Sequence, residues 1–113
     1  MNLNEWKKNI TTKETFDLAV QNHQKNNLES AKNLYKKILE KDPNLFQSIC
    51  FLGTLSIQIK NFERAIKLLN KAIGIQPNNA NVNNNLGIVN NELEDFQKAK
   101  YNLARTNIRN YNH

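Results

Sequence analysis

The sequence has few of the residues that cross-link or interrupt a chain. It contains one cysteine, two prolines and three glycines in 113 residues. The single Cys50 excludes an internal disulfide framework and a cysteine-based metal site, and it leaves a reducing cytosol as the default compartment. No run of about 18 apolar residues is present, so no membrane span is expected. Residues 1–12 lack the continuous apolar core of a signal peptide, and the expected localisation is cytoplasmic.

The remaining composition fits one soluble helical domain. Apolar residues make up 39% of the chain and charged residues 23%, which is typical of a folded protein and not of a disordered one. The net charge is +6 and the isoelectric point is near 9.6. This basic balance raises the question of a nucleic-acid partner, which the position of the charges has to answer.

The sequence repeats itself at a fixed interval. Leu18, Leu52 and Leu86 are each 34 positions apart, and a small residue follows each of them. The unit Phe46–Pro77 shows the pattern best, and imperfect copies precede and follow it. A period in this range, kept at many positions, indicates a helical repeat array. The other residues in register are Ala19, Gly53 and Gly87; Leu28, Phe62 and Phe96; Ala31, Ala65 and Ala99; Tyr35, Leu69 and Leu103; and Pro43 with Pro77.

Turn signals recur with the same period. Asn27, Asn61 and Asp95 each precede an expected second helix, where a short side-chain acceptor can cap free backbone N–H groups. Pro43 and Pro77 cannot continue a helix, so each ends a unit. Asn44, and Asn78 or Asn79, are expected to cap the helices that follow. Small residues in both helices of a unit predict that the two helices pack closely.

These residues resemble the tetratricopeptide repeat, a 34-residue helix–turn–helix unit. The likeness rests on Leu-Gly in the first helix, on the spaced alanines of the second, and on the proline after the first two units. It implies an all-α fold, a right-handed superhelical solenoid of antiparallel helix pairs. Three repeats are expected, at 12–45, 46–79 and 80–113. The third departs from the family at Thr106 and Tyr111, so its last helix could run on towards Asn110. Residues 1–11 are expected to form a short capping helix in which Leu3, Trp6 and Ile10 cover the first repeat.

The resemblance also implies a function. Family members are mostly non-catalytic and hold peptides or partner proteins in the concave groove formed by the first helices, so the protein is expected to be a scaffold or adaptor and not an enzyme. Amide side chains there can pair with a peptide backbone, and Phe16 and Phe51 can anchor apolar groups. The groove residues that the resemblance implies are Phe16, Val20, Gln24, Gln47, Cys50, Phe51, Thr54, Gln58, Asn81, Asn84, Asn85 and Ile88.

Two family subtypes and one chemical alternative fit less well. The clamp for acidic C-termini needs several basic groove residues, and only Lys13 is present. The asparagine ladder of glycosyltransferase arrays is matched at Asn85 but broken at Asp17 and Phe51. Cys50 and His23 both map to the groove, so a thiol–imidazole pair is conceivable, but no orienting acid accompanies it. No catalytic, cofactor-binding or metal-binding residues are therefore predicted.

Two other hypotheses compete with groove binding. The chain could be an oligomerisation or spacer array that self-associates through its third repeat, or the N-terminal part of a larger enzyme such as a glycosyltransferase. An RNA-binding surface is disfavoured, because the lysines of the second helices face solvent on the convex side without aromatic residues for base stacking. Protein or peptide partners are thus expected, and nucleic acid is not.

Overall fold

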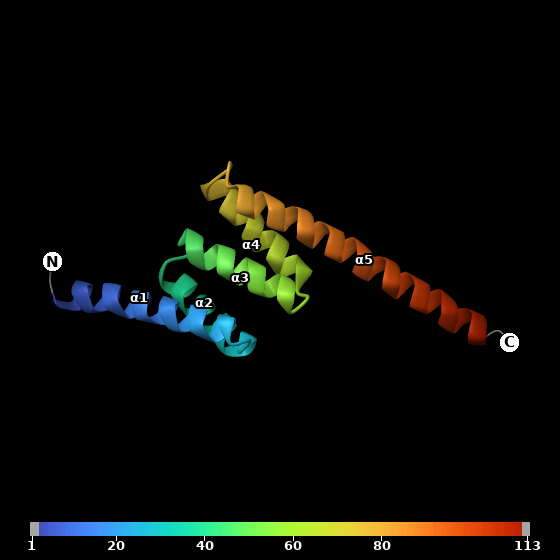
Figure 1. The fold of residues 1–113 in the computed structure, drawn as a ribbon, viewed down its shortest axis with the longest axis horizontal. Coiled ribbons are helices and arrows are strands. Elements are labelled where there is room, and N and C mark those ends of the chain that lie inside the picture. Colours follow the sequence, from blue (N-terminus) through green and yellow to red (C-terminus); the bar gives the residue numbers. More distant parts are fainter. Residues whose placement is uncertain (1–2, 112–113) are drawn as a thin grey trace.

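The computed structural model describes the backbone of residues 3–111 and the side chains of residues 12–106. Within that part, the chain forms five α-helices and no strand. They are α1 (Leu3–Gln24), α2 (Leu28–Lys41), α3 (Phe46–Gln58), α4 (Phe62–Ile75) and α5 (Ala80–Tyr111). Each helix packs on the next one in sequence, and α1–α2 and α3–α4 form two antiparallel hairpins (Figure 1). The molecule is elongated, 74 × 30 × 21 Å, as expected for an all-α solenoid.

The two hairpin turns have the same backbone geometry. Asn26 and Lys60 adopt positive φ angles of 63° and 64°, so each leaves the right-handed helix. The next residue's N–H then bonds back to the carbonyl five positions earlier, Asn27 to Asn22 and Asn61 to Ser56, both at 2.8 Å. This is the hydrogen-bond pattern of a Schellman helix ending. The local sequence thus closes α1 and α3 in the same way.

The predicted caps hold at two of the expected positions. Asn61 Oδ1 accepts a hydrogen bond from Arg64 N at 3.3 Å, and Asn79 Oδ1 accepts one from Val82 N at 3.1 Å. Asn27 precedes α2 but its side chain makes no cap bond. At α3 the cap residue is Leu45, so Asn44 does not cap it.

Small residues let the paired helices approach closely, as predicted. Ala19, Ala31, Ala65 and Ala72 are fully buried. A Cβ added to Gly53 would lie only 3.1 Å from Leu69 Cδ2, so glycine is what allows α3 and α4 to touch there. Leu18, by contrast, is 49% exposed, while its repeat equivalent Leu52 is 4% exposed. Leu52 is buried in a cluster with Ala31 and Tyr35 of α2, and no described helix precedes α1 to bury Leu18 in that way.

The expectation of a separate capping helix at residues 1–11 is wrong for the backbone that is described. Residues 3–11 are the first turns of α1, which continues without a break to Gln24. The physical reason is that Leu3–Gln24 contains neither glycine nor proline to end the helix. The side chains of Leu3, Trp6 and Ile10 lie outside the described residues.

The third unit is not a helix pair. α5 runs straight from Ala80 to Tyr111, and Asp95, expected to cap a second helix, lies inside it. The second half of α5 projects beyond the other four helices (Figure 1). Every described residue from Glu94 to Thr106 is exposed.

Four substitutions relative to the second unit explain the straight helix. A hairpin would bury the side of α5 that carries Asn83, Asn90 and Asn91, at the positions of Ile49, Ser56 and Ile57 in the second unit. Burying an unpaired amide costs about 1–3 kcal/mol. A turn would also force Glu94, equivalent to Lys60, into the left-handed conformation. In the straight helix Glu94 instead pairs with Lys98 at 3.0 Å across the expected turn.

Candidate functional site

The surface formed by α1, α3 and the first half of α5 is hollowed in two adjoining places. Between α3 and α5 it contains a pocket of about 230 Å³. Six of the twelve predicted groove residues line this pocket. Four come from α3 and two from α5: Gln47, Cys50, Phe51 and Thr54, and Asn81 and Asn85. The pocket therefore lies among residues that the family resemblance assigns to a groove.

Three further lining residues were missed by the sequence analysis. They are Phe46, Asn79 and Val82. Phe46 and Asn79 lie at or just before the starts of α3 and α5, where the assumed groove positions did not extend. Val82 is 2% exposed and belongs to the core, so it closes the pocket from below. Pro77 predicts that α4 ends before residue 77. This could have indicated that Asn79 lies in the loop before α5, at the edge of the pocket.

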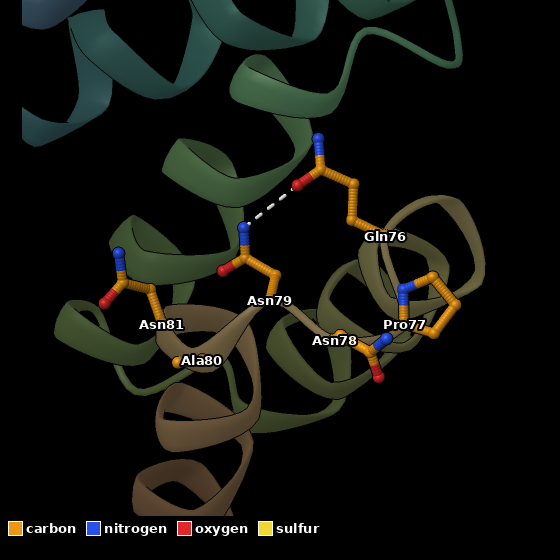
Figure 2. A pocket seen from close by; sticks show the side chains of 6 residues that line it. All are labelled: Gln76, Pro77, Asn78, Asn79, Ala80 and Asn81. Carbon is orange, nitrogen blue, oxygen red and sulfur yellow. Dashed lines mark hydrogen bonds between the residues drawn. The ribbon is translucent and has the colours of Figure 1, made fainter.

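Asn79 is held in place by two hydrogen bonds. Its Oδ1 caps α5 through Val82 N, and its Nδ2 donates to Gln76 Oε1 at 3.0 Å. Figure 2 shows the Asn79 side chain turned towards Gln76, whereas Asn78 points to the other side of the loop. The loop forms a second, more polar hollow lined by residues 76–81. The α4–α5 loop thus positions one wall of the groove.

A third hollow adjoins the groove at its α1 end. It has a volume of about 490 Å³ and shares Gln47 with the α3–α5 pocket. Phe16, a predicted groove residue, lines it together with Lys13 of α1 and Lys41 of α2. Asp42 also lines it, so this end of the surface carries both signs of charge, whereas no charged residue lines the α3–α5 pocket.

An aromatic cluster joins α1, α2 and α3 under the groove. Phe51 stacks on buried Tyr35 with ring centroids 5.9 Å apart, and Phe16 meets Phe51 edge-on at 5.6 Å. Phe51 is still 37% exposed, so part of its ring remains available to a ligand. This packing fixes the aromatic surface before any ligand arrives.

His23 is fixed by both of its ring nitrogens. Nε2 lies 2.6 Å from Gln58 Oε1, and Nδ1 lies 3.2 Å from the Tyr35 hydroxyl. A proton on Nε2 donates to Gln58, and the hydroxyl of Tyr35 donates to Nδ1. The Gln58 side-chain oxygen is thus already bonded to His23 of α1 and is not free to contact a ligand. His23 therefore joins α1, α2 and α3.

Cys50 does not form the conceivable thiol–imidazole pair, because both His23 nitrogens have other partners. Burial raises the pKa of the Cys50 thiol. A thiol with a raised pKa has less of the reactive thiolate at neutral pH. The remaining predicted groove residues, Val20, Gln24, Asn84 and Ile88, do not line the described pockets, although Ile88 is 43% exposed.

Comparison with known families decides the identity of the repeat. The family model for the tetratricopeptide repeat matches residues 22–86. The chain belongs to the tetratricopeptide repeat family. Its fold is thus that of a protein-interaction module, a role in which such repeats are typically non-catalytic. The match ends at Leu86, within the first half of α5.

Solved structures of tetratricopeptide repeats superpose on this chain. The C-terminal TPR-containing domain of a Plasmodium falciparum protein described as FK506-binding has a TM-score of 0.78 and 27% identity, covering 85% of this chain and 64% of that chain. A crystal structure of MamA protein has a TM-score of 0.70 and 28% identity, covering 77% and 48%. The chain therefore spans less than two thirds of either structure. A search of curated proteins finds no significant match.

Among residues 3–111, no helix is long and apolar enough to cross a membrane. No group of three or more histidine, cysteine or acidic side chains in that part of the chain is placed to hold a metal ion.

Proposed function

We propose that this tetratricopeptide repeat protein is a non-catalytic interaction module that holds a peptide or partner segment in the groove between α3 and α5. The observation that supports this most directly is the pocket in which Phe51 and Cys50 lie beside the amides of Gln47, Asn81 and Asn85. Apolar surface there can receive a side chain, and each amide offers both a donor and an acceptor.

The lining indicates what kind of segment fits. Extended peptide backbones present alternating N–H and C=O groups, which amide side chains can bind whatever the peptide sequence. The α3–α5 pocket has no charged lining residue, so a charged side chain placed there would lose hydration without gaining an ion pair. The ligand segment is therefore uncharged at this point and carries an aliphatic or small side chain.

The groove is largely formed in advance. Phe51 is stacked on Tyr35, Asn79 is held by Gln76, and Gln58 is bound to His23. A surface whose side chains are already ordered loses less entropy when a ligand binds. This favours groove binding with little rearrangement of α3 and α5.

A capture experiment from the source cell tests the proposal. Wild-type protein is compared with Asn85→Ala/Thr54→Lys, which changes the groove, and with Lys67→Ala/Lys71→Ala, which changes exposed residues of α4. All three should melt at similar temperatures, because none of the four residues is fully buried. Capture of a protein by wild type and by the α4 variant, but not by the groove variant, is expected.

Alkylation of Cys50 gives a second readout at the same site. A bound partner should slow the reaction of iodoacetamide with Cys50, because the thiol lines the pocket. Equal capture by all three proteins, together with unchanged alkylation when the partner is present, would contradict groove binding.

A further inference from the structure

A row of exposed side chains runs along α5 where the helix leaves the body of the molecule. Ile88, Glu92, Phe96 and Lys100 stand four positions apart, so they are neighbours along one side of the helix. Ile88 and Phe96 are 43% and 44% exposed, and both charged side chains are exposed as well. Leu103 continues this side and is also exposed. The row therefore has a definite order of apolar, acidic, aromatic, basic and apolar side chains.

The second half of this row has no helix on it in the described part of the chain. Phe96 contacts Phe62, at the start of α4, with ring centroids 5.8 Å apart. Beyond this contact α5 projects past the other four helices (Figure 1). Leu69, the repeat equivalent of Leu103, is fully buried in α4, whereas Leu103 is exposed. A position that the second unit uses for contact between helices is therefore left uncovered here.

The charges of the row are placed symmetrically about Phe96. Glu92 lies four positions before it and Lys100 four positions after it. Lys100 Nζ lies 5.4 Å from the centroid of the Phe96 ring. The ion pairs described for the chain include neither Glu92 nor Lys100. Lys98 and Arg105 project from the opposite side of α5, so they do not border the row. The row thus carries one unpaired charge of each sign, at equal distances from its centre.

Such a row is complementary to itself when it runs in the opposite direction. In the commonest class of helix packing, the axes cross at about 50° and rows of side chains four apart lie beside each other. When two copies of α5 cross antiparallel at Phe96, each Glu92 faces the Lys100 of the other copy. The two Phe96 rings meet at the centre, and Ile88 of one copy lies near Leu103 of the other. Charged and apolar side chains are then matched at the same time.

This pairing distinguishes a second copy from other occupants. A helix with charges of one sign would be attracted by Glu92 or by Lys100 and repelled by the other. A parallel pair of copies would place Glu92 beside Glu92 and Lys100 beside Lys100, and like charges across an interface disfavour association. An antiparallel pair of copies forms two ion pairs and covers the exposed apolar side chains of both helices. The charge pattern therefore favours the antiparallel pair.

We propose that the protein forms a two-fold symmetric dimer in which α5 of one copy crosses α5 of the other, antiparallel, at Phe96. The same surface serves in both copies, as in other two-fold interfaces. One helix from each copy makes a small interface, so association is weak and depends on concentration. Residues 88–103 do not line the α3–α5 pocket. The dimer therefore does not rest on the proposed binding of a ligand in the groove.

Sedimentation of charge variants tests this dimer. The wild-type chain should show a monomer–dimer equilibrium in the micromolar range that weakens as salt is raised. Glu92→Lys and Lys100→Glu should each weaken dimerisation about tenfold or more, because each places like charges opposite each other. The double variant Glu92→Lys/Lys100→Glu restores both ion pairs, so it should dimerise within about threefold of the wild type. A mixture of the two single variants should form a heterodimer for the same reason.

Matched controls locate the interface on the helix. Glu94→Lys makes the same change of charge on the opposite side of α5 and should leave the dissociation constant unchanged. Leu103→Glu should weaken the dimer about tenfold or more, whereas Tyr101→Glu should not, although the two side chains are equally exposed at 63% and 62%. Asn85→Ala changes the α3–α5 pocket and should not affect the dimer. All of these side chains are exposed or half-buried, and equal melting temperatures check that each variant folds.

Three results would overturn the proposal. One is a wild-type chain that stays monomeric at every concentration from micromolar to millimolar. Another is a dimer that Glu92→Lys and Glu94→Lys weaken equally, because the interface would then not lie on the Phe96 side of α5. The third is a double charge variant that dimerises no better than the single ones, because Glu92 and Lys100 would then not face each other.

Discussion

One repeat position holds glycine in both α3 and α5, but the two glycines have different surroundings. A Cβ at Gly53 would lie 3.1 Å from Leu69 Cδ2 and 3.2 Å from its Cγ, whereas a Cβ at Gly87 would meet nothing within 4 Å. We expect Gly53→Ala to destabilise the fold by about 1–3 kcal/mol through overpacking. Gly87→Ala should stabilise it by about 0.5–1 kcal/mol through helix propensity. Urea unfolding of both variants measures whether the free energy of unfolding falls for Gly53→Ala and rises for Gly87→Ala.

This pair also tests whether α5 is open. If the third unit closed into a hairpin like the second, Leu103 would pack on residue 87 as Leu69 packs on Gly53. Destabilisation by Gly87→Ala of the same size as that by Gly53→Ala would therefore contradict the straight helix.

Tyr35 makes the stability depend on pH in the alkaline range. Burial raises the pKa of Tyr35 from 10.0 to about 12. Because the folded state holds the proton more tightly, this contribution to stability is full below pH 10 and is lost as pH rises towards 12. At pH 11 the loss is about 1.4 kcal/mol.

The matched variant for this prediction is Tyr35→Phe. It removes the ionising group but also the hydrogen bond to His23, so it should be less stable at pH 8 by about 1 kcal/mol. Between pH 8 and pH 11, however, its free energy of unfolding should fall by less than that of the wild type. An equal fall in both proteins would show that the Tyr35 hydroxyl does not titrate as expected.

At the scale of the helix, two asparagines in equivalent turns differ in what their side chains do. Asn61 accepts a hydrogen bond from Arg64 N, while Asn27 makes no cap bond at α2. We expect Asn61→Ala to cost about 1 kcal/mol and Asn27→Ala to cost clearly less. Thermal unfolding of the two single variants measures the difference. Equal losses would mean that the caps contribute by backbone conformation and not by the side-chain bond.

The straight α5 predicts a long distance between two exposed positions. Spin labels at Asn84→Cys and Asn102→Cys, in a Cys50→Ser background, are 18 residues apart. At a rise of 1.5 Å per residue they should be about 27 Å apart along the helix. In a closed hairpin the same positions would lie on neighbouring helices, whose axes are about 8–10 Å apart. A short distance measured by pulsed electron resonance would restore the third helix pair.

Much of the fold follows from the sequence, and the failures have physical causes. The repeat period identified the family and the helix pairs of the first two units, because it fixes which positions face each other. Six of the residues that the resemblance assigns to a groove line the α3–α5 pocket. The period wrongly predicted a turn before Asp95. Asp95 is a good cap residue, but Glu94 before it pairs with Lys98 across the expected turn and favours a continuous helix. The polar residues Asn83, Asn90 and Asn91 carried the contrary signal. Residues that repeat with the period do not show whether the residues between them allow a turn.

The same limit applies to the groove. Positions taken from the family pattern included Gln58 and Gln24, but a side chain's availability depends on its neighbours. Gln58 is used by His23, a contact between residues 35 positions apart that no local spacing predicts. Asn79 was expected only as a cap, and its second role follows from its contact with Gln76.

At the scale of the whole molecule, two core clusters share two partly buried side chains. One cluster surrounds Ala31 and Tyr35, and the other surrounds Ala65 and Leu69. Leu39 and Leu68 are the partly buried residues that pack against both clusters. In a repeat protein, cooperativity depends on such contacts between neighbouring units. These two leucines therefore add to the coupling between the hairpins that Leu52 and Leu55 of α3 provide as members of the Ala31–Tyr35 cluster.

Leu68→Ala should weaken the coupling between the two hairpins. Ile66 lies on the same helix and packs against the Ala65–Leu69 cluster but not against the Ala31–Tyr35 cluster, so Ile66→Ala is the matched control. In urea unfolding followed by circular dichroism, Ile66→Ala should lower the midpoint and leave the slope unchanged, since only stability is lost. Leu68→Ala should lower the midpoint and also broaden the transition or divide it into two steps, because the contact between units is lost as well. Unchanged slopes in both variants would mean that other contacts, such as those of Leu52 and Leu55 with Tyr35, are enough to couple the hairpins.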